Sequence, residues 1–200
     1  MRIGKVLFPV TTLGPGKRLG IWVQGCDRFC KGCSNEELQT FDETKDVSVE
    51  KLFDGIKNFP FDGVTISGGE PFLQVKDLKR LIELFLENGY DDILVYTGFT
   101  MRELVEKNDE DIDFILSHIA VLIDGPFVEN LVDDIPLRGS KNQCVYILNR
   151  KFESAYRSVL AEEKKVDIFH FENEVHFIGI PFKGYDKLYK NYIKKVKSDE

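Results

Sequence analysis

Three cysteines stand within one run of eight residues, in the spacing Cys26-x-x-x-Cys30-x-x-Cys33. Cysteine thiolates are the usual ligands of iron–sulfur clusters, and a [4Fe–4S] cluster takes four of them when it is fully coordinated. In a reducing compartment, such close cysteines indicate metal binding rather than disulfides. The triplet therefore predicts a [4Fe–4S] cluster in which one iron stays open to another ligand.

The same three cysteines are also compatible with a zinc site, to which Cys144 or a histidine would add a fourth ligand. Zinc sites usually combine two Cys-x-x-Cys-like pairs, whereas this sequence holds one compact triplet. A coincidental group of structural thiols is a third interpretation. Cys144 stands alone in the run QCVYIL, where we expect a small buried strand residue.

A second pattern begins 35 residues after Cys33, where a strand-like apolar run ends in Gly68-Gly69-Glu70-Pro71. Small residues at such a turn let a ligand approach the backbone closely, and backbone carbonyls can accept hydrogen bonds from an ammonium group. Alone, this pattern fits an ordinary turn between a strand and a helix. Its place on the strand that follows the cysteine triplet makes it a candidate ligand site.

The spacing of apolar residues alternates between helical and strand-like along the chain. We expect helices over residues 47–59, 75–89, 100–107, 112–118 and 151–165, and strands over 61–69, 91–98, 120–125 and 143–148. A hairpin over 166–181 and a Lys-rich amphipathic segment over 187–200 complete the expected elements. Strands that alternate with helices form parallel units, and sites in such folds lie at the carboxyl ends of the strands.

The cysteine triplet and the Gly-Gly-Glu-Pro strand end together resemble the radical S-adenosylmethionine (SAM) superfamily. Further blocks are similar to the activating proteins of anaerobic (class III) ribonucleotide reductase: residues 14–18, 30–33, 96–99, 123–127, 138–143 and 178–181. The resemblance implies an α/β fold, a partial (β/α) barrel of about five to six units. It also implies one radical SAM domain over residues 1–200, with the hairpin and helix from about residue 165 as an extension.

By this resemblance, Cys26, Cys30 and Cys33 bind the cluster. The residues implied to contact SAM are Gly32, Cys33, Ser34, Gly68, Gly69, Glu70, Thr97 and Asp124. Asp124 fits a turn at a strand end equally well. Gly32 stands where many superfamily members carry an aromatic residue. Arg18 and Arg138 are expected in loops beside the site, and an exposed surface position is the more common arrangement for such arginines.

The resemblance implies an oxidoreductase that cleaves SAM to methionine and a 5′-deoxyadenosyl radical. This radical would take a hydrogen atom from one glycine of anaerobic ribonucleotide reductase. A flavodoxin or ferredoxin would supply the electron. The alternatives are a radical SAM enzyme acting on another peptide, protein or nucleotide, and a non-catalytic module that binds zinc or a cluster.

Composition narrows the remaining classes of function. The chain has 200 residues, 42% of them hydrophobic, and a formal net charge of −7. This negative charge makes nucleic-acid binding an unfavoured function. No apolar run approaches the roughly 20 residues of a membrane-spanning helix, and the N-terminus lacks the layout of a signal peptide. We therefore expect a cytoplasmic protein that binds neither nucleic acid nor membrane.

Overall fold

The structure is a computed structural model, and it describes residues 1–171, 174–182, 185 and 192. A six-stranded sheet has the order β1-β2-β3-β4-β5-β6, and a separate hairpin pairs β7 with β8. The strands of the large sheet are β1 (Ile3–Val10), β2 (Arg18–Val23), β3 (Gly63–Gly68), β4 (Ile93–Tyr96), β5 (Val121–Asp124) and β6 (Cys144–Ile147). The hairpin strands are β7 (Asp167–His170) and β8 (Val175–Ile178).

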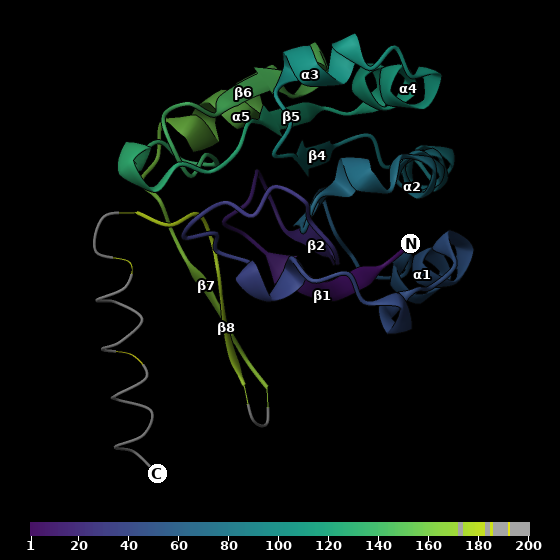
Figure 1. The fold of residues 1–200 in the computed structure, drawn as a ribbon, viewed down its shortest axis with the longest axis horizontal. Coiled ribbons are helices and arrows are strands. Elements are labelled where there is room, and N and C mark those ends of the chain that lie inside the picture. The colour runs from purple at the N-terminus through teal and green to yellow at the C-terminus, as the bar shows by residue number, and fades with distance from the viewer. Residues whose placement is uncertain (172–173, 183–184, 186–191, 193–200) are drawn as a thin grey trace.

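Strands β2 to β5 are parallel, whereas β1 and β6 run antiparallel to their neighbours at the two edges. The helices are α1 (Val49–Ile56), α2 (Val75–Glu87), α3 (Met101–Glu106), α4 (Glu110–His118) and α5 (Glu153–Leu160). Figure 1 shows the sheet as an arc, with α1, α2 and α4 along its outer side and the hairpin across from them. The predicted α/β fold with a partial barrel is confirmed.

The helices form where the apolar spacing predicted them. Ser48 caps α1 by accepting a hydrogen bond from the backbone N–H of Lys51. Thr100 and Glu103 form a reciprocal capping box at the start of α3. Helix α2 buries Leu78, Leu81, Ile82 and Phe85 in the main core, which also holds side chains of α1 and β3. These caps and apolar faces hold the strand ends in place.

Strands β1 and β2 are not among the strands expected from the sequence. The position of Arg18 also differs from the one expected. All six residues of β2 are buried, so the strand lacks the alternation that marks a half-exposed strand. Arg18 lies inside β2 with no exposed surface, instead of in a loop beside the site. Its guanidinium donates to Asp92 at 2.8 Å and to the Thr65 hydroxyl at 2.6 Å, at the amino ends of the parallel strands.

The hairpin is anchored to the end of β1. The Asp167 carboxylate accepts hydrogen bonds from the backbone and hydroxyl groups of Thr11 and Thr12, at 2.7 to 3.1 Å. Ile178 of β8 packs in a small apolar cluster with residues of β1 and β2. The Lys-rich segment expected over 187–200 lies outside the described residues except for Tyr192. Across the described part of the chain, no helix is long and apolar enough to cross a membrane.

Candidate active site

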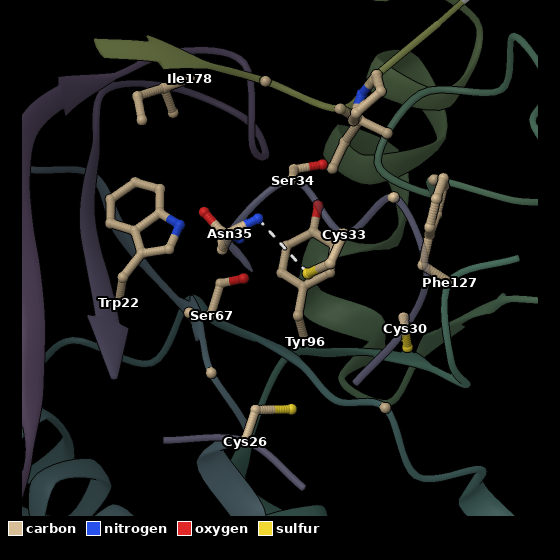
Figure 2. Close-up of a pocket in the computed structure, with 18 of the residues that line it drawn as sticks. Trp22, Cys26, Cys30, Cys33, Ser34, Asn35, Ser67, Tyr96, Phe127 and Ile178 are labelled. Carbon is tan, nitrogen blue, oxygen red and sulfur yellow. Dashed lines mark hydrogen bonds between the residues drawn. The ribbon is translucent and has the colours of Figure 1, made fainter. Parts of the chain in front are cut away.

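One cavity of about 700 Å³ lies at the carboxyl ends of β3 and β4 and is closed on one side by the hairpin segment. All three cysteines of the triplet line it, as Figure 2 shows. The other lining residues named for SAM binding are Gly32, Ser34, Gly68, Gly69, Glu70 and Thr97. Segments far apart in the sequence therefore meet around one space.

The loop that carries the cysteines begins directly after β2 and is held by backbone hydrogen bonds. The N–H of Gly25 donates to Leu38, and the N–H of Cys26 donates to Gln39. At its far end, the N–H of Cys33 donates to the carbonyl of Cys30 at 3.2 Å. The residues after the triplet thus fold back over its start, and the three thiols come to face the same cavity.

The environment of the thiols fits an iron–sulfur cluster. Burial raises the pKa of Cys26 and of Cys33 above the ordinary thiol value, so without bound metal both groups are protonated thiols. The Cys26 sulfur accepts the N–H of Arg28 at 3.4 Å, and the Cys33 sulfur accepts the N–H of Asn35 at 3.5 Å. Hydrogen bonds of this kind to cysteine sulfurs are one of the protein's means of tuning a cluster.

The zinc alternative has no ready-made set of ligands among the described residues. Within the described residues, no three His, Cys, Asp or Glu side chains gather closely enough to hold one ion. A cubane is wider than one ion, so its ligands stand farther apart.

Cys144 is exposed at the start of β6, which corrects the expectation of a buried residue. Strand β6 lies at the edge of the six-stranded sheet.

The Gly68-Gly69 turn packs against the start of the cysteine loop. The N–H of Gly69 donates to Val23 at 2.7 Å, and the N–H of Glu70 donates to Gly25 at 2.9 Å. A Cβ atom on Gly69 would lie 2.3 Å from the Gly25 carbonyl oxygen, and Gly68 has a φ of +109°. Both glycines are therefore required by the contact between this turn and the loop.

The Glu70 side chain points into the protein instead of into open space, with 1% of its surface exposed. Its carboxylate accepts hydrogen bonds from the Thr97 hydroxyl at 2.8 Å and from the N–H groups of Phe72 at 2.9 Å and Gly98 at 2.6 Å. Burial raises the pKa of Glu70 to about 7. The side chain thus joins the ends of β3 and β4 beneath the cavity.

A family model described as a 4Fe-4S single cluster domain matches residues 12–146, which is more than half of the chain. An anaerobic ribonucleoside-triphosphate reductase-activating protein of Haemophilus influenzae is 33% identical over 142 residues, covering 66% of this chain and 89% of the relative. The protein of the same name from Escherichia coli is 33% identical over 153 residues, covering 70% and 96%. The chain belongs to this family of reductase-activating proteins.

Among solved structures, QueE from Escherichia coli covers 49% of this chain and 52% of its own length, with 23% identity and a TM-score of 0.42. Membership of the reductase-activating family confirms the resemblance found in the sequence. It also confirms the predicted [4Fe–4S] cluster and SAM as cofactors, and the prediction of a radical SAM oxidoreductase.

In this member of the reductase-activating family, one residue expected at the SAM site lies apart from the cavity. The Asp124 carboxylate accepts the N–H of Met101 at 2.6 Å and the N–H of Cys144 at 3.0 Å. It is buried, and its neighbour Gly125 lines the cavity in its place. These contacts favour the strand-end role of Asp124. Arg138 forms an ion pair with Asp133 and is also absent from the cavity lining.

Several residues of the site were not singled out from the sequence. Arg28, inside the cysteine loop, lies 3.7 Å from the centre of the Phe99 ring and 3.4 Å from the Glu103 carboxylate, so it ties the loop to α3. Trp22 and Tyr96 form part of the cavity wall. Tyr96 falls within a motif shared with the family, but its type alone does not show which way it points.

The segment 175–182 supplies a further wall of the cavity, and it lies beyond the residues that the family model matches. The periodicity of the sequence predicted a hairpin there, but periodicity does not show what a hairpin covers. The described part of the hairpin packs against the site, and the single domain over residues 1–200 stays a prediction.

Proposed function

We propose that this protein activates an anaerobic ribonucleoside-triphosphate reductase by generating a glycyl radical on it. The observation that carries the proposal is the meeting of Cys26, Cys30 and Cys33 with the Gly68-Gly69 turn around one cavity, in a chain that belongs to the reductase-activating family. The names of the relatives supply the reductase as the partner.

The residues of the cavity have separate tasks in this proposal. The three thiolates hold the [4Fe–4S] cluster and leave one iron without a protein ligand. When bound there, the cluster supplies the electron that splits SAM into methionine and a 5′-deoxyadenosyl radical. The backbone at Gly68, Gly69 and Glu70 receives the amino group of SAM. The residues Gly32 to Ser34 and Thr97 contact the rest of the molecule.

The protein also shapes the access to the reacting atoms. The hairpin segment and the cysteine loop wall the cavity from two sides, and enclosing a reactive species keeps water and side reactions away. The remaining opening admits a segment of the reductase that carries the target glycine. The product is a radical on the Cα of that glycine, and 5′-deoxyadenosine carries the abstracted hydrogen.

The electron donor and the cellular compartment are also part of this proposal. The one-electron chemistry needs a reductant, and a flavodoxin or ferredoxin is the class of protein that we infer for it. Four unpaired thiols are kept reduced in the cytoplasm, where disulfides are rare, so the cytoplasm is the proposed compartment. The acidic chain, with a net charge of −7, supports a partner other than nucleic acid.

Anaerobic reconstitution tests the proposal in three steps. The protein should take up about four irons per chain, as a [4Fe–4S] cluster requires. With a strong reductant it should form 5′-deoxyadenosine from SAM. With the anaerobic reductase of the same organism added, electron paramagnetic resonance should detect a glycyl radical on the reductase. Formation of 5′-deoxyadenosine without that signal would assign the protein to another substrate. Zinc uptake without SAM cleavage would contradict the radical chemistry altogether.

A further inference from the structure

Trp22 in β2 carries an indole N–H that has no acceptor among the described residues. The side chain is 3% exposed, and Figure 2 shows its nitrogen turned into the cavity that holds the cysteines. In the described part of the chain, the polar atoms that are both sealed and unpaired are Arg2 Nε, Arg28 Nε and the Tyr96 hydroxyl, so the Trp22 nitrogen keeps its access to the cavity. Buried donors are nearly always paired in native proteins, so the acceptor is an atom of what the cavity binds.

Ser67 in β3 places a hydroxyl group beside this indole. Trp22 and Ser67 are register partners in the parallel pair of β2 and β3, so their side chains lie on the same face of the sheet. Ile21 and Val23, the neighbours of Trp22 in β2, pack into the main core on the other face. Ser67 also lines the cavity, and its hydroxyl has no partner among the described residues. Because neighbouring strands lie about 4.8 Å apart, the two polar groups reach the same short stretch of a ligand.

The walls around these two polar groups are largely apolar. Leu13 and Ile178, the latter from the hairpin, pack with Trp22 in one cluster and also line the cavity. The Lys5 ammonium group lies 5.5 Å from the centre of the Trp22 ring and pairs with the Glu37 carboxylate at 3.1 Å, so their charges cancel. A neutral ligand that offers hydrogen-bonding groups therefore fits this part of the cavity better than a charged one.

A protein backbone is a ligand of this kind. It offers a carbonyl acceptor and an N–H donor on almost every residue, and a glycine has no side chain for the enzyme to recognise. The inference rests on the function proposed above, in which a glycine of the reductase enters the cavity. We propose that the segment carrying this glycine lies between β2, β3 and the hairpin. The Trp22 N–H donates to one of its carbonyl oxygens, and the Ser67 hydroxyl accepts from one of its N–H groups.

The place of Ser67 in the chain brings such a segment beside the SAM site. Neither Trp22 nor Ser67 is among the residues expected to hold SAM, but Ser67 directly precedes Gly68, the first residue of the turn expected to do so. A glycine held at Ser67 is therefore a neighbour of bound SAM. Hydrogen transfer requires this arrangement, because reacting atoms must lie within about 3–3.5 Å of each other.

The test compares the wild-type protein with Trp22→Phe, which removes the indole N–H but keeps an aromatic ring, and with Ser67→Ala, which removes only the hydroxyl oxygen. All three proteins carry the cluster and SAM, and the partner is the anaerobic reductase of the same organism. In each variant the dissociation constant for the reductase should rise about three- to tenfold, as for the loss of one hydrogen bond. The dissociation constant for SAM should change less than that for the reductase.

The matched control is Ser117→Ala, because the Ser117 hydroxyl donates to Phe114 within α4 and Ser117 does not line the cavity. It should bind the reductase and SAM as the wild type does. If Trp22→Phe does not fold, Ser67→Ala decides. An unchanged reductase affinity in Ser67→Ala would overturn the inference, and so would a loss confined to the affinity for SAM. A wild-type protein that binds SAM but not the reductase would contradict the proposed function itself, which distinguishes the two failures.

Discussion

The hydroxyl of Thr97 donates a hydrogen bond of 2.8 Å to the carboxylate of Glu70, and this contact joins the carboxyl ends of β3 and β4. Glu70 follows the two glycines that pack on the cysteine loop. The same carboxylate also accepts the N–H of Gly98. One buried side chain thus sets the spacing between the turn expected to hold SAM and the end of the next strand.

Glu70 should make stability depend on pH. Burial raises its pKa in the folded protein from the usual 4.5 to about 7. Between these values the folded state holds a proton that the unfolded chain has already lost, so the free energy of unfolding should fall as the pH rises through this window. Urea denaturation of the metal-free protein at pH 5.5 and 7.5 measures the fall. Glu70→Gln should remove it, and a Glu70→Gln protein with the wild-type pH dependence would contradict the assignment.

Substitutions of the cavity cysteines and of Cys144 should have different effects on the cluster. Cys30→Ala removes one of the three thiols of the cavity, so the cluster and SAM cleavage should both be lost. Cys144→Ala changes an exposed residue of an edge strand and should leave both as in the wild type. Iron content and 5′-deoxyadenosine formation measure the difference. Loss of the cluster in Cys144→Ala would show that the fourth cysteine is a ligand.

Arg28 should stabilise the cysteine loop. Its guanidinium lies over the Phe99 ring and pairs with Glu103, so Arg28→Ala should destabilise the protein by about 1 kcal/mol and lower its iron uptake. Arg28→Lys should keep only part of the wild-type stability and iron uptake, because the lysine ammonium group lacks the planar surface that stacks on the Phe99 ring.

Arg102→Ala is the matched control for Arg28→Ala, since Arg102 is an arginine of α3, the helix that Arg28 contacts, and pairs with Glu106 at the surface. It should change stability by no more than about 0.5 kcal/mol. Thermal melting and iron analysis of the three variants test the prediction. Equal changes of melting temperature and iron content in Arg28→Ala and Arg102→Ala would contradict the proposed role of Arg28 in stabilising the cysteine loop.

The buried pair of Arg18 and Asp92 should be a major stabilising feature far from the chemistry. Asp92→Asn leaves the Arg18 charge buried without its carboxylate, which typically costs about 3–5 kcal/mol. Asp91→Asn, one residue away, affects only an exposed pair with Lys151 and should cost less than about 1 kcal/mol. Urea denaturation of the two variants compares them directly, and similar midpoints would refute the assignment.

Local patterns predicted a large part of this molecule. Helices α1 to α4 were predicted because each shows an apolar face, and Ser48 and Thr100 cap their helices as the sequence indicates. Strand β2 was not predicted, because it is buried along its whole length and carries both a glycine and a charged residue. The wrong expectations for Arg18 and Cys144 share one cause, since burial depends on neighbours from distant parts of the chain.

The sequence by itself determined the chemistry of this protein. The spacing of three thiols sets the cluster, and the Gly-Gly-Glu-Pro turn after a strand marks the place for SAM, because both depend on residues close together in the chain. Only the tertiary structure decided where side chains point. In the structure, the Glu70 carboxylate accepts a hydrogen bond from Thr97, and the Asp124 carboxylate accepts a backbone N–H group. Tyr96 packs against the apolar cluster that includes Ile178 of the hairpin. These outcomes follow from contacts between segments far apart in sequence, which no local pattern records.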